Sequence, residues 1–428
     1  MNKRFVPCIY LYHGQAVRSE QDHMLVSADP VALARCYMEN NADELIVFDC
    51  NEPDDQLHDQ ALDQIKAICA IAEVDVIGAG NIKRMEDVKK ILYTGCKKAI
   101  LNYDKETNVS ITKEVSQKFG KEKLLAAISQ TGIYEREEEL LTEYISGLLL
   151  MNTGSIREIA QKTALPFYAL LEDVSLNKLL DLLTIENITG ITGNTMNDNS
   201  KEILKLKDIC LENHIPVEKL IPSILWSELK LNSDGMIPVI VQDYKTSEVL
   251  MLAYMNEEAY DQTLRTGKMT YFSRSRNQLW LKGETSGHYQ YVKELSADCD
   301  KDTLLAKVSQ VGVACHTGAK SCFFQEIVKK DYTQSANPLK VFQDVFDVIL
   351  DRKVHPKEGS YTNYLFDKGI DKILKKLGEE ATEIVIAAKN PNPNEIKYEI
   401  SDFLYHMMVL MAEKQIGWEE ITEELANR

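Results

Sequence analysis

The chain has 428 residues, of which 44% are hydrophobic and 27% are charged, and its formal net charge at neutral pH is −17. This length suffices for two to four globular domains. The excess of acidic residues argues against a nucleic-acid partner or an anionic membrane surface, because both attract clustered Lys and Arg. The sequence contains neither an apolar stretch of the roughly 18 residues that a membrane span needs nor a signal peptide, so we expect a cytoplasmic protein.

Residues 1–222 alternate short apolar runs with amphipathic stretches that predict helices, as at 29–42 and 85–96. Strands are predicted at 5–12, 44–50, 74–80, 98–103, 124–129, 144–151, 167–173 and 188–193. A series of eight strands separated by helices favours a closed parallel (β/α)8 barrel. A doubly wound open sheet is the alternative, and only the number of strands argues against it.

Within this first segment, a resemblance rests on KRFVPCIYL (3–11), the run from Ala28 to Asp49, GNIKRMEDVKKILYTGCKKAILN (80–102) and KFGKEKLLAAIS (118–129). These stretches resemble the cyclase barrel of imidazole glycerol phosphate synthase and, more distantly, its sister isomerase, both of histidine biosynthesis. In that family a catalytic Asp ends the first strand and another ends the fifth, where this chain has Tyr10 and Ser129. The family's glycine-rich phosphate loops are reduced to GAGN (78–81) and TGNT (192–195).

Because both proton-carrying carboxylates of the cyclase family are missing, we expect a degenerate barrel that serves as a scaffold or an interaction surface. Retained activity through other residues is the alternative.

A domain boundary is predicted at 222–234, where the barrel pattern stops and Ser, Asn and Asp gather. The next segment, 235–330, is rich in predicted strands, at 236–244, 249–255, 269–276, 279–283 and 289–295. We therefore expect a β-rich α+β domain there, followed by a linker at 331–338.

Two short motifs of the central segment carry metal-ligand chemistry, ADCDKDTLL (297–305) and ACHTGAKSC (314–322). If residues 297–305 form an extended strand, Asp298, Asp300 and Asp302 share one face and Cys299 points away from them. Carboxylate oxygens suit Mg²⁺ and thiolates suit Zn²⁺, so the motifs predict two metal sites.

Three thiols, those of Cys299, Cys315 and Cys322, would leave a zinc position open for catalysis, with His316 as a base or a spare ligand. The other six cysteines are irregularly spaced in apolar or helical contexts, which indicates buried thiols and no disulfide framework. A solvated acidic turn with incidental cysteines is the alternative to the metal sites.

Three stretches of the central segment, 236–260, 270–292 and 298–324, closely resemble phosphoribosyl-AMP cyclohydrolase. The resemblance implies that Asp298, Asp300 and Asp302 bind Mg²⁺. It also implies that Cys299, Cys315 and Cys322 bind Zn²⁺ within a homodimer in which the neighbouring subunit supplies Cys299. The implied reaction is hydrolytic opening of the adenine ring by cleavage of the N1–C6 bond.

Other polar residues of this segment are candidate substrate contacts. Arg274 and Arg276 are suited to bidentate hydrogen bonds with phosphate, although a solvated strand end would look the same. Lys282, Glu284 and His288 lie between aromatic residues and are candidates for substrate binding, with His288 as a second candidate for proton transfer. A buried histidine with a structural role is the alternative for His288.

From Pro338 to the end the pattern is helical, with helices predicted at 339–353, 361–389, 395–414 and 419–425 and a break at PNPN (391–394). We expect an all-α bundle over 338–428. Glu380 and Glu383 are three residues apart on one helix, and Glu399 and Asp402 repeat this spacing on the next. Antiparallel packing of these helices would gather four carboxylates around Mg²⁺.

Apolar neighbours of these carboxylates are expected to face the core of the bundle, such as Ile384, Ile386, Ile400 and Phe403. Acidic helix faces without a metal are the common alternative to such a site.

Three stretches of the bundle, GSYTNYLFDKG (359–369), KKLGEEATEIVIAAK (375–389) and YEISDFLYHMMVLM (398–411), resemble phosphoribosyl-ATP pyrophosphohydrolase. The resemblance implies that Glu380 and Glu383 act in catalysis around Mg²⁺, and that the products are phosphoribosyl-AMP and pyrophosphate. Lys376 is a candidate for neutralising phosphate oxygens, unless it is an ordinary surface lysine.

The sequence as a whole predicts a bifunctional enzyme of histidine biosynthesis. Its C-terminal part would convert phosphoribosyl-ATP to phosphoribosyl-AMP, and its central part would open the purine ring of that product. A metal-binding regulatory or scaffold protein with a structural zinc is the competing hypothesis, and a substrate assay distinguishes the two.

Overall fold

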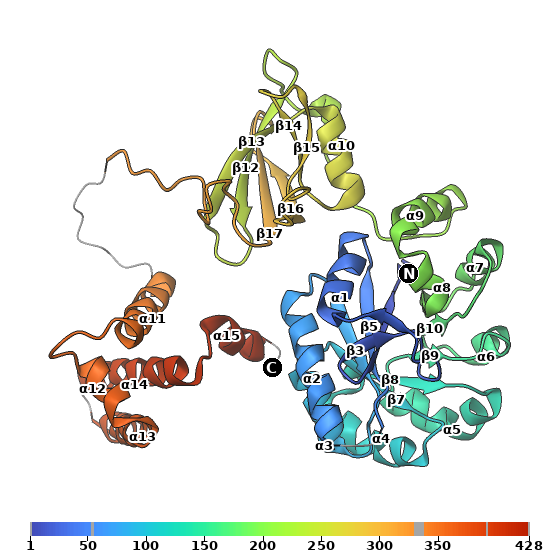
Figure 1. The fold of residues 1–428 in the computed structure, drawn as a ribbon, viewed down its shortest axis with the longest axis horizontal. Helices are drawn as coiled ribbons and strands as arrows, with labels where there is room; N and C mark the ends of the chain where they lie inside the picture. The colour runs from blue at the N-terminus through green and yellow to red at the C-terminus, as the bar shows by residue number, and fades with distance from the viewer. Residues whose placement is uncertain (1, 53–54, 329–337, 391–392, 427–428) are drawn as a thin grey trace. The chain divides into compact units, whose positions relative to one another are not determined.

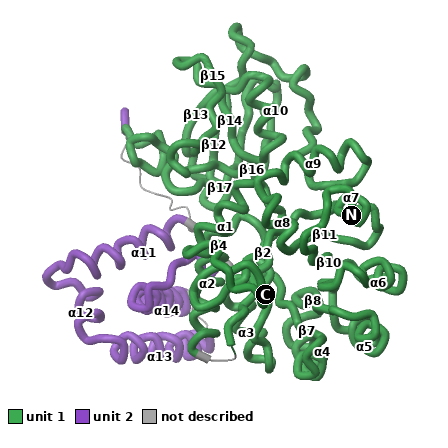
Figure 2. Tube along the Cα trace, turned by 45° about the vertical axis from the view of Figure 1, so that its right-hand side comes forward, with its two compact units in different colours: residues 1–325 green, residues 326–428 purple. Residues whose placement is uncertain are grey.

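The computed structural model describes residues 2–52, 55–328, 338–390 and 393–426. Its contacts divide the chain into two compact units, residues 1–325 and residues 326–428, shown in different colours in Figure 2. Each unit is described by itself. Among the described residues, no helix combines the length and the apolar character that a bilayer crossing requires.

The first part of unit 1 is a closed parallel barrel (Figure 1). Its first strand is interrupted, with β1 (Arg4–Phe5) pairing with the last strand and β2 (Cys8–Tyr12) pairing with the second. The other strands follow in sequence order: β5 (Glu44–Asp49), β6 (Asp75–Ala79), β7 (Lys98–Asn102), β8 (Leu124–Ile128), β9 (Leu148–Leu150), β10 (Phe167–Leu170) and β11 (Ile188–Thr192). All the expected strands form, and their closure into a ring excludes the open-sheet alternative.

Helices follow the barrel strands and surround them (Figure 1). They are α1 (Pro30–Glu39), α2 (Asp55–Ile71), α3 (Met85–Tyr93), α4 (Glu106–Phe119), α5 (Thr131–Tyr144), α6 (Ile156–Lys162), α7 (Leu176–Leu183), α8 (Asn194–Asp198) and α9 (Ile203–Glu212). A hairpin of β3 (Gln15–Val17) and β4 (Leu25–Ser27) extends β2, and short 3-10 turns occur at η1 (Lys121–Lys123), η2 (Ser200–Glu202) and η3 (Trp226–Glu228). The start of α1 shows the local cause of a helix end, because Asp29 accepts hydrogen bonds from the backbone of Val31 and Ala32.

The centre of the barrel is packed with side chains. An inner cluster of buried residues includes Ile46, Ile77, Ile100, Leu125 and Leu149, one from each of five neighbouring strands. Near the N-terminal ends of the strands, the Tyr168 hydroxyl donates to Glu44 at 2.6 Å, and Arg4 pairs with the same carboxylate. The barrel is therefore a solid core and not a channel.

The central part of unit 1 is a four-stranded sheet with a helix and a hairpin. The sheet has the order β13 (Val249–Met255), β12 (Ile237–Asp243), β17 (Leu304–Gln310) and β16 (Gln290–Ala297), and the hairpin consists of β14 (Thr270–Ser273) and β15 (Gln278–Leu281). The sequence prediction missed α10 (Glu257–Thr266) and β17. The helix was recognisable from Asn256, which caps its start, and from Gly267, which ends it with φ of +67°.

The barrel and the central sheet contact each other within unit 1. Glu73 of the barrel accepts a hydrogen bond from Ser309 on β17 at 2.6 Å and lies 3.1 Å from the amine of Lys293 on β16. Arg265, at the end of α10, pairs with Asp208 on α9 at 2.8 Å. These polar contacts join two parts that belong to one compact unit.

Unit 2 is helical, with α11 (Pro338–Val354), α12 (Tyr361–Lys368), α13 (Ile370–Ala387), α14 (Pro393–Lys414) and α15 (Trp418–Ala426). The prediction of one long helix at 361–389 is wrong, because Gly369 adopts φ of +77° and separates α12 from α13. The prediction that the apolar neighbours of the carboxylates face the core is wrong for Ile386 and Ile400, which are 59% and 40% exposed, whereas Ile384 and Phe403 are half-buried. Of the predicted linker, residues 331–337 lie outside the described residues, as do residues 391 and 392 of PNPN.

Candidate active sites

The two barrel positions where the cyclase family carries catalytic aspartates are occupied differently here. Tyr10 lies in the middle of β2, is buried, and stacks on Phe48 with 5.0 Å between the ring centroids. Ser129 directly follows β8, and its hydroxyl donates to Asp104 at 2.7 Å. Tyr10 therefore contributes an aromatic ring to the packed interior of the barrel.

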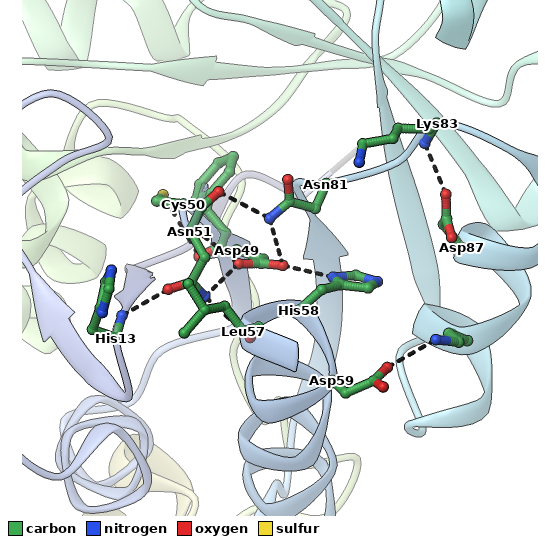
Figure 3. A network of polar contacts seen from close by, with 12 residues as sticks. His13, Asp49, Cys50, Asn51, Leu57, His58, Asp59, Asn81, Lys83 and Asp87 are labelled. Atoms are coloured by element: carbon green, nitrogen blue, oxygen red, sulfur yellow. Dashed lines mark hydrogen bonds and ion pairs between the residues drawn. The ribbon is translucent and has the colours of Figure 1, made fainter. Parts of the chain in front are cut away.

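A polar network that the sequence reasoning missed lies at the C-terminal end of β5 (Figure 3). Asp49 Oδ2 lies 2.7 Å from Nδ1 of His58 and accepts from the side chain of Asn81 at 2.9 Å, while Oδ1 accepts from the side chain of Asn51 at 2.8 Å. Asp49 and His58 are both buried. Gly80, in the reduced phosphate loop, approaches so closely that a Cβ atom there would lie 2.1 Å from the Asp49 carbonyl oxygen.

The position of this network indicates a structural role. Side chains alternate along a strand, so Asp49 shares its face with Leu45 and Val47, which belong to the apolar layer between strands and helices. The network thus ties the loop after β5, the first turn of α2 and the loop after β6 together. An acidic residue at the end of a buried strand was the signal in the sequence.

The three aspartates of the central segment come together in a turn. Residues 298–303 connect β16 to β17, so the predicted extended strand at 297–305 is wrong. Carboxylate oxygens of Asp298, Asp300 and Asp302 nevertheless lie within 4.8 Å of one another, and all three residues are exposed. Backbone N–H groups of Thr303 and Asp302 donate to Asp298 at 3.2 and 3.0 Å and, against the opposing effect of desolvation, lower the pKa of its carboxyl group.

Two of the three thiols lie near one buried lysine. The hydroxyl and the backbone N–H of Thr317 donate to Sγ of Cys315, the hydroxyl at 3.1 Å, and these hydrogen bonds lower the pKa of the Cys315 thiol. Burial lowers the pKa of the Lys282 amine, and the neighbouring Cys322 and Cys315 partly offset this effect. Cys299 is exposed in the turn between β16 and β17, and among the described residues the three thiols do not form a group within 4.8 Å.

Arg274 and Arg276 are both held against aromatic rings. They lie in the turn between β14 and β15. The guanidinium of Arg274 lies 3.9 Å from the ring centroid of Tyr254, and that of Arg276 lies 5.6 Å from Trp280. Stacking of this kind occupies the face of a guanidinium and leaves its N–H edge for other partners, although Arg276 Nε also donates to Ser273 at 3.2 Å.

The other candidates of the central segment differ in burial. The half-buried ring of His288 lies over Gly312, where a Cβ atom would come within 2.6 Å of the imidazole. Gly312 precedes Cys315 by three residues, so His288 faces the segment that carries one of the thiols. His316 and Glu284 are exposed.

Three acidic residues of unit 2 converge across two helices. Glu380 and Glu383 on α13 and Glu399 on α14 place one carboxylate oxygen each within 4.8 Å of one another. Desolvation, a hydrogen bond with Glu383, and the charges of Glu383, Glu380 and Asp402 raise the pKa of Glu399. Asp402 is exposed and does not belong to the group within 4.8 Å. Lys376 approaches this group, with its amine 3.4 Å from Glu380.

The sequence reasoning also missed a buried histidine next to this cluster. His406 Nδ1 donates to the carbonyl of Asp402 at 2.8 Å and lies 3.8 Å from Oε1 of Glu380. A carbonyl oxygen only accepts, so Nε2 of a neutral His406 accepts from the Tyr361 hydroxyl, 3.2 Å away. His406 follows Asp402 by four residues on one helix, and this spacing was the signal in the sequence.

Three family models match separate parts of the chain. The model for "Histidine biosynthesis protein" matches residues 4–164, the one for "Phosphoribosyl-AMP cyclohydrolase" residues 251–324, and the one for "Phosphoribosyl-ATP pyrophosphohydrolase" residues 342–428. The Asp298 turn, Cys315 and Cys322 lie in the second match, and the carboxylate cluster of α13 and α14 lies in the third.

Curated relatives cover about half of this chain and nearly their own full length. A "Histidine biosynthesis bifunctional protein HisIE" from Thermoanaerobacter pseudethanolicus is 56% identical over 212 residues, which are 47% of this chain and 98% of the relative. Proteins with the same description from Lactococcus lactis and Bacillus subtilis are 51% and 48% identical, covering 45% and 47% of this chain and 88% and 95% of the relatives.

Proposed function

The chain belongs to the family of histidine biosynthesis bifunctional HisIE proteins, and on this basis we propose how its parts divide the work. The protein is a bifunctional hydrolase with phosphoribosyl-ATP pyrophosphohydrolase and phosphoribosyl-AMP cyclohydrolase activities. We assign pyrophosphate release to residues 338–428 and ring opening to residues 235–330. The matched ranges 342–428 and 251–324, which lie inside these bounds, support this assignment.

The carboxylates of α13 and α14 are proposed to hold Mg²⁺ in the pyrophosphohydrolase site. The convergence of Glu380, Glu383 and Glu399 within 4.8 Å is the observation that carries this assignment, since oxygen ligands at such spacing fit a hard cation. Bound Mg²⁺ would neutralise phosphate charge and lower the pKa of water. Lys376 places its ammonium beside Glu380 and is suited to hold an anionic phosphate oxygen. Asp402 is proposed as an outer member of the site.

Two metal sites are proposed for the cyclohydrolase part. The turn of Asp298, Asp300 and Asp302 offers three exposed carboxylate oxygens, which fit Mg²⁺. Cys315 and Cys322 are assigned to Zn²⁺, whose Lewis acidity would activate water toward the purine ring. Both thiols lie beside the Lys282 amine, whose positive charge favours the thiolate that metal binding requires; hydrogen bonds from Thr317 lower the pKa of Cys315, whereas burial raises the pKa of Cys322.

The remaining polar side chains are assigned to the substrate phosphoribosyl-AMP. The N–H edges of Arg274 and Arg276 are proposed to bind its phosphate, with Tyr254 and Trp280 holding the two planes in place. Lys282 and Glu284 are proposed as further substrate contacts. His288 is the preferred proton carrier over the exposed His316, because its ring is held against Gly312 close to the thiol segment.

A homodimer is part of the proposal, because Cys299, Cys315 and Cys322 of one chain form no group within 4.8 Å among the described residues. Cys299 is exposed at the tip of a turn, where a second copy of the chain has access to it. A zinc held by Cys299 of one subunit and by Cys315 and Cys322 of the other would make ring opening depend on the dimer.

The barrel is proposed to be a non-catalytic relative of the cyclase of imidazole glycerol phosphate synthase. The buried, stacked ring of Tyr10 supports this proposal, because a phenol in this position does not replace the proton-carrying carboxylate of the cyclase family. The contacts of Glu73 with Ser309 and Lys293 are consistent with a scaffold role.

A substrate assay tests the assignment of the helical unit. With Mg²⁺ present, the protein should release pyrophosphate from phosphoribosyl-ATP and not from ATP or GTP. Equal release from free nucleoside triphosphates would instead favour an enzyme that clears nucleotides. Cleavage of none of these would contradict the assignment altogether.

A further inference from the structure

Three tyrosine rings lie nearly parallel beside the carboxylate cluster of unit 2. Tyr361 on α12 is flanked by Tyr364, at 6.1 Å between ring centroids and 23° between planes, and by Tyr405 of α14, at 6.5 Å and 24°. Tyr361 and Tyr364 are 45% and 42% exposed. We call these three residues the tyrosine shelf.

Hydrogen bonds hold two of the three rings of the shelf, those of Tyr361 and Tyr405, in place. The hydroxyl of Tyr405 lies 2.7 Å from that of Thr362, and the Tyr361 hydroxyl lies 3.2 Å from Nε2 of His406. The ring of His406 also meets Tyr361 edge-on, with 5.9 Å between centroids and 87° between planes. Exposed aromatic surface that is fixed in this way can receive a flat ligand without the cost of ordering the side chains first.

The ring of His406 lies between the tyrosine shelf and the carboxylate cluster. His406 contacts Tyr361 through Nε2, and its Nδ1 lies 3.8 Å from Oε1 of Glu380. The Lys376 amine approaches the same Glu380 oxygen at 3.4 Å. The Lys376 amine, the Glu380 carboxylate and the Tyr361 ring are therefore close neighbours, with the His406 ring between the last two.

We propose that the tyrosine shelf binds the purine ring of the nucleotide whose phosphates face Glu380, Glu383 and Glu399. This inference rests on the proposed pyrophosphohydrolase function of unit 2. Stacking of a base on an aromatic side chain contributes affinity for any purine, because it uses the π-face of the ring and not its edge. The released pyrophosphate has no ring, so the shelf retains substrate in preference to that product.

The test compares Tyr364→Leu with the unsubstituted protein in the pyrophosphate-release assay. Tyr364 is the better probe, because Tyr361 is also bonded to His406 next to the cluster. Removal of the ring should raise KM for phosphoribosyl-ATP about tenfold. The same substitution should change kcat by less than about twofold, because stacking on the purine contributes the same binding energy in the ground state and in the transition state. Tyr364→Phe keeps the ring and should show a much smaller rise in KM.

Two controls separate stacking from a general disturbance of the site. Inorganic tripolyphosphate carries phosphates without a base, so its inhibition constant should be the same for Tyr364→Leu and for the unsubstituted protein. Tyr93→Leu removes an exposed tyrosine from the barrel helix α3 and should leave KM unchanged.

Three outcomes would overturn the inference: an unchanged KM in Tyr364→Leu, an equal rise in KM and in the tripolyphosphate inhibition constant, or an equal loss in Tyr364→Phe. Failure of the proposed function itself looks different, because the unsubstituted protein would then release no pyrophosphate from phosphoribosyl-ATP.

Discussion

His58 and Asp49 form a buried pair at the C-terminal edge of the barrel, with 2.7 Å between Nδ1 of the imidazole and Oδ2 of the carboxylate (Figure 3). The pair connects the end of β5 with the first turn of α2. The side chains of Asn51 and Asn81 also donate hydrogen bonds to this carboxylate. Asp49 is therefore the acceptor on which several loop donors depend.

Removal of this acceptor should destabilise the barrel. Asp49→Ala removes the acceptor that His58, Asn51 and Asn81 share, and each buried donor that is left unsatisfied costs about 1–3 kcal/mol. Hydrogen exchange of peptides from residues 44–83 should become much faster. Asp59→Ala is the matched control, since Asp59 pairs with Lys90 at 2.8 Å on the surface and its loss should cost less than about 1 kcal/mol. Equal effects of the two changes would refute the structural role of Asp49.

Replacement of the exposed turn cysteine should separate the two activities. In Cys299→Ser, bound zinc and ring opening should both fall by more than about tenfold, because an alcohol is a poor substitute for a thiolate ligand. Pyrophosphate release should continue at the unsubstituted rate. Metal analysis and the two assays on one preparation measure all three quantities, with Cys36→Ser as a control thiol outside the site. Full zinc content in Cys299→Ser would rule out this ligand.

Loss of one carboxylate at the α13 and α14 cluster should abolish pyrophosphate release selectively. Glu380→Gln keeps the size of the side chain and removes its charge. Removal of a residue that only supports a metal ligand lowers activity roughly 10–100-fold. Because Glu380 is proposed to bind the metal directly, the rate of pyrophosphate release should fall by more than that. Titration with Mg²⁺ should show a weaker apparent affinity. Glu395→Gln, on the exposed start of α14, is the matched control. Retention of activity in Glu380→Gln would show that the metal is held elsewhere.

Introduction of an aspartate at position 10 of the first barrel strand should not produce a cyclase. Tyr10→Asp removes a buried ring stacked on Phe48 and buries a carboxylate, so we expect the barrel to lose about 3–5 kcal/mol of stability. Cyclase assays with this variant, alone and together with Ser129→Asp, should remain at background. Measurable cyclase activity in either protein would instead show that the barrel retains a substrate site.

The sequence by itself determined the kinds of elements and the kinds of ligands. Hydrophobic periodicity is local, and it placed the barrel strands, while the side chains of Asp298, Cys315 and Glu380 carry their metal preference wherever the chain places them. The resemblance to known families added the reactions that these residues serve.

Only the tertiary structure decided which distant groups meet. The pairing of β1 with β11 closes the barrel through contacts far apart in the chain, and no local pattern encodes it. The aspartates converge in the turn between β16 and β17 and not along a strand, and Glu399 joins Glu380 only because α14 packs on α13. The tyrosine shelf and the pair of Asp49 and His58 arise in the same way, because side-chain proximity across elements depends on packing and not on spacing along the chain.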